Sequence, residues 1–255
     1  MPESLDQFSL ADRGFVVTGA SSGIGRAMAG FLASAGAAVV LVARRENELA
    51  DAVDDIGARA SYVAADLGER ARLGEVAAQC KAAIQSDGID GVVNAAGINL
   101  REPVDEISLD SWDTTLNLNL SVPFFFTREF VPEMRQRNYG RVINIASLQS
   151  TRAFANGLAY GASKGGVCQL TRAMAEAWSR YGICCNALVP GFFPTELTEP
   201  VFNDSETRQR MARQTAVGRN GELEDLFGAT VFLASAASAY ITGQTLAIDG
   251  GFTAK

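Results

Sequence analysis

Short apolar runs alternate with longer segments of helical periodicity along the whole chain. The apolar runs are rich in Val, Ile and Ala and are continuous rather than alternating, as in strands that are covered on both faces of a sheet. We predict strands at 14–18, 38–42, 60–64, 89–94, 141–146, 183–189 and 245–248. The segments between them predict helices, among them 23–35, 46–56, 69–86, 109–136 and 158–180.

This alternation predicts an α/β fold, a Rossmann-like doubly wound parallel sheet of seven strands. No linker, repeat or low-complexity tract divides the 255 residues, so we expect a single domain over residues 1–255. The least regular part, at about 192–221, mixes charged residues with few structural signals. We interpret it as a helical lid over the substrate.

The charge balance restricts the partners. A net charge of −7 argues against binding to nucleic acid or to an anionic membrane. The longest uncharged run, from Ala27 to Ala43, contains Gly30, Ser34 and Gly36, so we interpret it as helix, turn and strand. The start of the chain has no secretory leader pattern, and we expect a cytoplasmic protein.

The absence of histidine excludes several kinds of active site. A Ser-His-Asp hydrolase, a zinc site with histidine ligands and an imidazole base all need this residue. The four cysteines form no C-x-x-C pair, and we interpret them as buried reduced thiols rather than metal ligands or disulfides. They are Cys80, Cys168, Cys184 and Cys185. We therefore expect no metal site.

A glycine-rich stretch, TGASSGIG at 18–25, joins the first predicted strand to the first helix. Glycines at such a junction allow backbone N–H groups to approach a pyrophosphate, and the helix amino terminus favours its charge. The alternative is a turn that merely connects two elements; the position after the first strand favours the nucleotide site. The candidate binding residues are Gly19, Ser21, Ser22, Gly23, Ile24 and Gly25.

Ala43 follows the second predicted strand at the place where an NAD site would put a carboxylate for the ribose, and two arginines come after it. A guanidinium matches a 2′-phosphate, and one charge-assisted bond gives about a 10- to 100-fold preference. Arg44 therefore favours NADP(H) over NAD(H). The alternative is a solvated helix start.

Further candidates for cofactor contacts follow later strands. Asp66 and Leu67 end the third strand, where a carboxylate can accept from the adenine amino group. Asn94 ends the fourth strand before small residues that leave room for adenosine. The stretch 190–195, containing Pro190, Gly191 and Thr195, follows the sixth strand and is expected to hold the nicotinamide amide.

Tyr160 and Lys164 stand four residues apart in a predicted helix, so they share one face. An ammonium beside a phenol stabilises the phenolate and lowers the phenol pKa. The hydroxyl of Ser147, at the end of the preceding strand, is placed to hydrogen-bond a reacting carbonyl. The trio suits ketone reduction or alcohol oxidation, although a lone Y-x-x-x-K also arises by chance. Asn119 has two interpretations: a relay residue in line with Lys164, or a capping or packing residue.

These motifs, in this order and spacing, resemble the short-chain dehydrogenase/reductase family over nearly the whole chain, ending with 241–244 and 249–251. The resemblance implies Tyr160 as acid/base, Lys164 as the group that lowers its pKa and holds the nicotinamide ribose, Ser147 as the residue that orients the carbonyl, and Asn119 in a proton relay. It also implies a sheet ordered 3-2-1-4-5-6-7 and a homotetramer. Ala95 departs from the Asn common in the family, which affects the sheet more than the chemistry.

The stretches 96–101, 143–150 and 190–198 resemble gluconate 5-dehydrogenase-like sugar-acid dehydrogenases within the family. That resemblance implies a small-molecule substrate, of the gluconate/5-ketogluconate type, whose carboxylate needs a cation. Arg101 and Arg152 follow strands at the expected pocket, and each is alternatively a surface arginine. The substrate candidates are Arg101, Ser147, Gln149 and Arg152.

Two other functions compete. A 3-oxoacyl-[acyl-carrier-protein] reductase would dock an acidic carrier on a basic rim, for which the arginines at 135, 137, 141 and 180 are candidates unless they are solvated helix ends. A catalytically silent NADP-sensing protein would keep the fold without the chemistry. The intact Ser147, Tyr160 and Lys164 argue against it.

Overall fold

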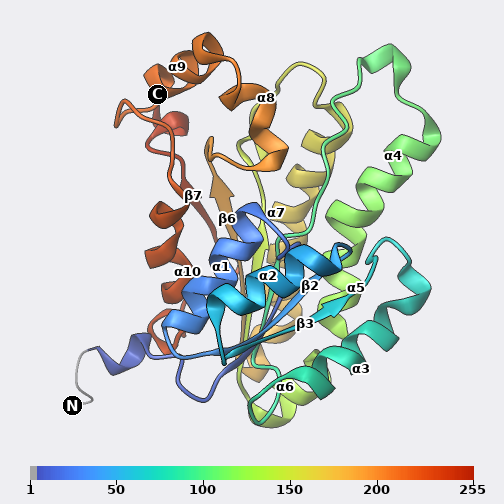
Figure 1. Ribbon diagram of the computed structural model, residues 1–255, viewed down its shortest axis with the longest axis vertical. Helices are drawn as coiled ribbons and strands as arrows, with labels where there is room; N and C mark the ends of the chain where they lie inside the picture. Colours follow the sequence, from blue (N-terminus) through green and yellow to red (C-terminus); the bar gives the residue numbers. More distant parts are fainter. Residues whose placement is uncertain (1–4) are drawn as a thin grey trace.

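The computed structural model describes residues 5–255, so the first four residues of the expected domain lie outside the described residues. Seven parallel strands form one sheet in the order β3-β2-β1-β4-β5-β6-β7, which confirms the expected doubly wound topology (Figure 1). The strands are β1 Gly14–Thr18, β2 Ala38–Ala43, β3 Ala60–Ala64, β4 Gly91–Asn94, β5 Gly140–Ile145, β6 Ile183–Pro190 and β7 Thr245–Ile248.

Helices cover both faces of the sheet. On β1, Val16 packs into one apolar core, whereas Phe15 and Val17 pack into the other, because successive side chains of a strand point to opposite faces. Helices α1, α2 and α10 contribute to the second core, and α3, α5, α6 and α7 to the first. The helices are α1 Gly23–Ser34, α2 Glu46–Ile56, α3 Leu73–Ala83, α4 Leu109–Leu116, α5 Val122–Arg128, α6 Val131–Arg137, α7 Leu158–Trp178, α8 Glu199–Phe202, α9 Ser205–Gln214 and α10 Phe227–Ala234.

The prediction of one continuous helix over 109–136 is wrong. A π-helical turn at Asn117–Ser121 separates α4 from α5, and α6 then starts anew at Val131. Pro132 lies in the first turn of α6, where the missing N–H of proline has no helical partner to lose. Pro123 comes two residues after the π turn, at a position where its missing N–H does remove a helical hydrogen bond. The wider π turn carries Asn119, whose side chain is buried at 1 % exposure.

The segment 192–221, which we expect to form the lid over the substrate, is largely helical. It holds a short 3₁₀ turn at Glu196–Thr198, then α8 and α9. Asp204 caps α9 because its carboxylate accepts from the backbone N–H groups of Glu206 and Thr207. Figure 1 shows α8 and α9 beyond the tip of β6, at the carboxyl ends of the strands.

Two further sequence expectations concern burial and the membrane. Cys80, Cys184 and Cys185 are buried and Cys168 is half-buried, all four as free thiols, in agreement with the sequence interpretation. Burial raises the pKa of Cys80 to about 12, so this thiol stays protonated. Within residues 5–255, none of the helices combines the length and the apolar character needed to cross a membrane.

Candidate active site

A cavity of about 740 Å³ lies at the carboxyl ends of the strands. Its walls come from the glycine-rich turn after β1, the ends of β2 to β6 and the segment 192–221. Most of the predicted site residues share this cavity. They are Gly19, Ser21, Ser22, Gly23, Ile24, Gly25, Arg44, Asp66, Leu67, Arg101, Ser147, Gln149, Tyr160, Lys164, Pro190, Gly191 and Thr195.

The glycine-rich turn is held tightly against the loop that follows β4. Gly19 has a φ of +65°, and a Cβ there would lie 2.7 Å from Cα of Ala96, so only glycine fits. The hydroxyl of Thr18 accepts from the backbone N–H groups of Ala95 and Ala96, each at 3.1 Å. The end of β1 is thereby tied to the end of β4, which sets the floor of the cavity.

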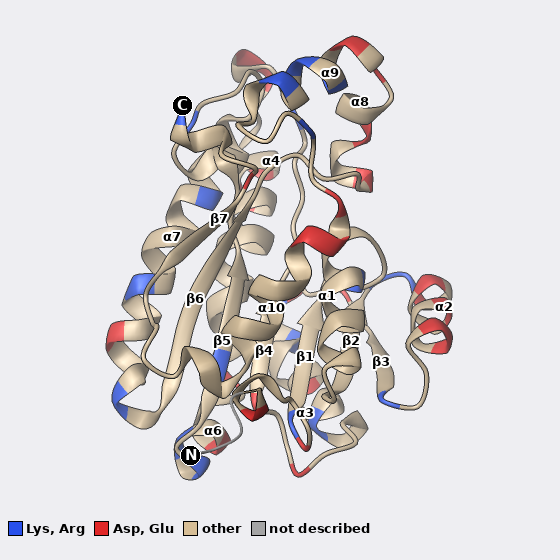
Figure 2. Ribbon diagram, turned by 90° about the vertical axis from the view of Figure 1, so that its left-hand side faces the viewer, with Lys and Arg blue, Asp and Glu red and all other residues tan. Residues whose placement is uncertain are grey.

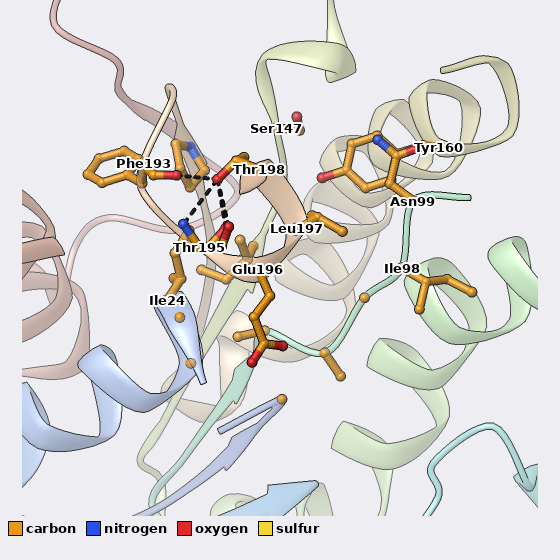
Figure 3. A pocket seen from close by; sticks show the side chains of 18 of the residues that line it. Ile24, Ile98, Asn99, Ser147, Tyr160, Phe193, Thr195, Glu196, Leu197 and Thr198 are labelled. Atoms are coloured by element: carbon orange, nitrogen blue, oxygen red, sulfur yellow. Dashed lines mark hydrogen bonds between the residues drawn. The ribbon is translucent and has the colours of Figure 1, made fainter. Parts of the chain in front are cut away.

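Ser147 and Tyr160 bring two hydroxyl groups to the same part of the cavity (Figure 3). Ser147 follows β5, and its oxygen accepts from the backbone N–H of Gln149 at 3.1 Å, which fixes its position at the start of a short turn. The hydroxyl of Ser150, in the same turn, donates to the carbonyl of Lys164 at 2.8 Å. This contact ties the Ser147 turn to α7, the helix that carries Tyr160.

The electrostatics of Tyr160 differ from the sequence expectation. Burial raises the pKa of Tyr160, while a hydrogen bond with Ser147 and the charge of Arg101 oppose that rise. The ammonium of Lys164 lies 5.7 Å from the centre of the Tyr160 ring and donates to the carbonyl of Ile145 at 2.6 Å. The charge that acts on Tyr160 in this structure is that of Arg101, and the role of Lys164 in lowering the pKa of Tyr160 stays a prediction.

Lys164 is itself an unusual cation. Its side chain is buried at 3 % exposure, and burial lowers its pKa to about 8. A buried ammonium is costly because it loses its hydration. A backbone carbonyl is its hydrogen-bond partner, and Figure 3 places the neighbouring Tyr160 with its hydroxyl toward the side of Ser147. A positive charge is thus held beside the phenol, and no carboxylate within residues 5–255 forms an ion pair with it.

Asn119 does not line the cavity. Its amide oxygen accepts from the N–H of Ile98 at 2.9 Å, and its amide nitrogen donates to the carbonyl of Ile98 at 2.9 Å and to the hydroxyl of Ser163 at 3.0 Å. It therefore positions the loop after β4 against α7. A relay role for Asn119 stays a prediction.

Two other predicted site residues lie outside the cavity. Asn94 is buried, and its amide donates to the side chains of Asn144 and Thr127 at 2.8 and 2.9 Å, so it links β4 to β5 and α5 rather than lining the cofactor side. The guanidinium of Arg152 donates to the backbone carbonyl of Lys255 at 3.1 Å. The sequence could not separate these two residues from the cavity residues, because they too come at or after the carboxyl end of a strand, the side of the sheet on which the cavity lies.

Arg101, by contrast, lies on the cavity wall. Its backbone has a φ of +55°, and its guanidinium donates to the carbonyl of Leu197 at 2.8 Å. The charge of Arg101 reaches Tyr160, whose pKa it lowers. The structure therefore brings a cation, the phenol and the segment 192–221 together.

On the other side of the cavity, Arg44 is exposed and lies 3.9 Å from the carboxylate of Asp66. The neighbouring Arg45 was not among the predicted binding residues, yet its guanidinium donates to the hydroxyls of Ser21 and Ser22 at 3.1 and 3.0 Å. It also pairs with Glu196 in the segment 192–221. The Arg-Arg pair was the available signal for Arg45, whereas Glu196 had none.

The chain is similar to known proteins over nearly its whole length. A family model described as enoyl-(acyl carrier protein) reductase matches residues 19–253. Gluconate 5-dehydrogenase of Gluconobacter oxydans (strain 621H) is 39 % identical over 97 % of both chains. The 2-dehydro-3-deoxy-D-gluconate 5-dehydrogenase of Escherichia coli (strain K12) is 38 % identical over 98 % of this chain and 99 % of that protein.

A solved structure is similar over its whole length. The crystal structure of a gluconate 5-dehydrogenase from Burkholderia cenocepacia J2315, in complex with NADP and tartrate, has a TM-score of 0.92 and 38 % identity. The similarity covers 99 % of this chain and 100 % of that one.

Proposed function

The chain belongs to the short-chain dehydrogenase/reductase family, and we propose that it transfers a hydride between NADP(H) and a hydroxyl or ketone of a sugar acid of the gluconate/5-ketogluconate type. It is an oxidoreductase. Relatives named for gluconate and for 2-dehydro-3-deoxy-D-gluconate support the substrate class. The observation that carries the proposal is Arg101, a cation on the same cavity wall as Tyr160 and Ser147.

The donors around the cavity fit a phosphorylated dinucleotide. The turn at 19–25 offers backbone N–H groups and the two serine hydroxyls, and the guanidinium groups of Arg44 and Arg45 lie beside it. Asp66 and Leu67 line the adjoining part, and Pro190, Gly191 and Thr195 the far part. These residues would hold NADP(H), which supplies or accepts the hydride when bound.

The chain's own residues transfer the proton and hold the substrate oxygen in place. Tyr160 gives a proton to the oxygen of a ketone, or takes one from an alcohol, because its hydroxyl faces the cavity (Figure 3). Ser147 donates a hydrogen bond to the same oxygen and so keeps it beside Tyr160. The ammonium of Lys164 stabilises negative charge that develops on this oxygen and on the phenol. Segment 192–221 acts as the lid.

We expect Arg101→Ala to raise KM for gluconate by about 30- to 1000-fold while changing kcat/KM for a neutral hexitol by much less. The planar guanidinium can make two parallel hydrogen bonds to the substrate carboxylate, and the neutral hexitol lacks that partner. Steady-state kinetics with both substrates measures the difference. Arg152→Ala is the matched control, because it removes the same charge outside the cavity.

A panel of sugar acids, polyols and 3-oxoacyl thioesters tests the proposal independently. Turnover of sugar acids by the wild type, sensitive to Arg101→Ala, supports it. Equal losses for gluconate and the hexitol would mean that Arg101 only supports the fold. If the wild type turns over no sugar acid, the substrate class is wrong.

We expect Ala43→Asp combined with Arg44→Ala to shift cofactor preference from NADP(H) toward NAD(H). The double variant removes one phosphate partner and adds a carboxylate that repels a 2′-phosphate but suits a ribose hydroxyl. The dissociation constant for NADPH should rise about 10- to 100-fold or more, since each charge-assisted bond carries that much preference. Titrations with NADPH and NADH, followed by nicotinamide fluorescence, measure the shift.

Arg59→Ala provides the control for lost charge, because Arg59 precedes β3 and donates to the carbonyl of Gly36. An unchanged NADPH dissociation constant in the double variant would place the 2′-phosphate elsewhere.

The acyl-carrier-protein alternative loses its basic rim. Arg141 is buried at 3 % exposure and donates to the carbonyl of Ser235 at 2.9 Å. Arg137 pairs with Asp90, and both Arg135 and Arg180 lie against the ring of Tyr181. Arg135, Arg137 and Arg180 precede β5 or β6, and Arg141 is the second residue of β5. Figure 2 shows α6 at the opposite end of the sheet from α8 and α9. These arginines therefore do not border the cavity.

A silent NADP sensor also receives less support than an enzyme, because Ser147, Tyr160 and Lys164 share one cavity.

We extend the proposal to a homotetramer. Within the described residues, β7 has a sheet neighbour on one side only, and its Leu246 is exposed. Such an edge can pair with another copy of the chain.

A further inference from the structure

Arg45 and Glu196 form a contact that spans the mouth of the cavity. The two residues are 151 positions apart, and the two guanidinium nitrogens of Arg45 each lie 3.0 Å from an oxygen of Glu196. One of these nitrogens also donates to the hydroxyls of Ser21 and Ser22. The segment 192–221 is thereby fastened to the glycine-rich turn through one arginine.

Glu196 is oriented away from the reacting groups. Figure 3 shows its carboxylate on the opposite side from Ser147 and Tyr160. The carboxylate accepts from Arg45, whose guanidinium also donates to the serine hydroxyls of the glycine-rich turn, so it lies on the cofactor side of the cavity. Its contacts therefore concern the cofactor more than the sugar acid.

The groups around Glu196 are those of an anion site. A guanidinium that makes two parallel bonds, with serine hydroxyls beside it, suits a phosphate as well as a carboxylate. The Arg45 guanidinium holds the pKa of Glu196 below its usual value, with a smaller contribution from Ser22, so the carboxylate is ionised at neutral pH. A phosphate that approaches Arg45 meets a negative charge already in place.

The pair can be exchanged because it is not deeply buried. The side chain of Arg45 is 41 % exposed and that of Glu196 is 61 % exposed. Ion pairs this accessible are weak, since water screens their attraction. A phosphate that carries more charge than a carboxylate can therefore displace Glu196 from Arg45.

We propose that Glu196 is an internal anion that competes with the 2′-phosphate of NADP(H) for Arg45, so that Glu196 limits the preference for NADP(H) over NAD(H). The displacement of Glu196 also detaches the turn at 196–198 from the glycine-rich turn and couples cofactor binding to the lid. This inference rests on the proposed use of NADP(H). Arg45 lies two residues past β2, next to the place where the 2′-position is recognised.

The first test measures dissociation constants for NADPH and NADH without substrate, by nicotinamide fluorescence. Glu196→Gln removes the competing charge and keeps the side-chain size, so NADPH should bind about three- to tenfold more tightly. NADH, which lacks the 2′-phosphate, should change by less than about twofold. Glu199→Gln is the matched control, because Glu199 lies in the same segment and contacts Asn203 instead; it should change neither constant.

The second test follows the release of the lid directly. Adenosine 2′,5′-bisphosphate should increase amide hydrogen exchange over residues 195–202 in the wild type, whereas ADP, which lacks the 2′-phosphate, should not. In Glu196→Gln this exchange should be fast from the start and should not respond. Thermal unfolding of each variant confirms that it is folded.

The outcomes separate the two proposals. If the wild type binds NADPH tightly and Glu196→Gln leaves that binding unchanged or weakens it, the inference is wrong but the proposed function stands. Equal tightening of NADPH and NADH overturns it too, because the competition would then not involve the 2′-phosphate. A wild type that binds neither dinucleotide overturns the proposed function, and the inference with it.

Discussion

Tyr160→Phe is expected to lower kcat by about 100- to 10,000-fold, the range over which a positioned acid/base group contributes. The phenyl ring fills the same buried site, so the fold and the cofactor side of the cavity are preserved and only the proton donor is lost. The measurement is kcat for gluconate oxidation and for ketone reduction, together with the dissociation constant for NADPH, which should stay within about twofold of the wild type.

Tyr62→Phe is the matched control. Its hydroxyl interacts with Glu46 at 3.4 Å outside the cavity, so its loss should leave turnover unchanged. Should Tyr160→Phe keep a large share of the wild-type rate, another group must handle the proton and the proposed roles are wrong.

The pH dependence of the two directions follows from the state of Tyr160. Because burial raises the pKa of Tyr160, the phenol is protonated through the neutral range. Ketone reduction, which needs the protonated phenol, should therefore hold its rate there and fall only at alkaline pH. Alcohol oxidation, which needs the phenolate, should rise as the pH increases.

Lys164→Met is expected to abolish most turnover and yet to stabilise the fold at pH 7. Burial lowers the pKa of Lys164 from 10.5 to about 8, so the folded chain carries this charge at a cost that the unfolded chain does not bear. A difference of this size corresponds to about 3 kcal/mol, from which the lost hydrogen bond to Ile145 subtracts about 1 kcal/mol. Methionine fills a similar volume without a charge.

The sign of this effect sets its pH window. Below pH 8 both states hold the proton and the full cost is present; between pH 8 and 10.5 the folded state releases its proton first, and the cost falls; above 10.5 it is absent. Urea unfolding should therefore show the variant to be more stable by about 2 kcal/mol at pH 7, and the advantage should vanish toward pH 10.5.

Lys81→Met provides the control for a lysine that is partly exposed and paired with Glu133 at 2.8 Å. Lys81→Met should be slightly less stable than the wild type at pH 7. It should not show a stability advantage that disappears toward pH 10.5. A Lys164→Met variant that is less stable than the wild type at pH 7, by an amount independent of pH, would contradict the cost assigned to the buried charge. The expected trade of stability for activity is typical of functional sites.

Most of the fold could be predicted from the local sequence pattern. The strands at 14–18, 60–64 and 245–248 have the predicted bounds. β1 is fully buried, as its continuous apolar run predicts, whereas β7 at the edge of the sheet is largely exposed. The glycine-rich turn and the pair Tyr160 and Lys164 also follow from short-range spacing. The predicted helix at 109–136 is wrong because Pro132 marks the first turn of a new helix and a π turn precedes Pro123, features that the apolar periodicity masks.

The tertiary structure alone decided which polar side chains share the cavity. Asn94 ends β4, and Arg152 follows β5 as Ser147 does, yet cross-strand and terminal contacts hold both of them outside the cavity. Lys164 is directed to a backbone carbonyl by the packing of α7 on β5. Arg45 meets Glu196 across 151 residues, because the glycine-rich turn and the segment 192–221 approach one another only in the folded chain. The local sequence pattern predicts the secondary structure in which a residue lies. The side chain that it contacts depends on which distant segments meet in the folded chain, and the spacing of residues along the sequence does not determine this.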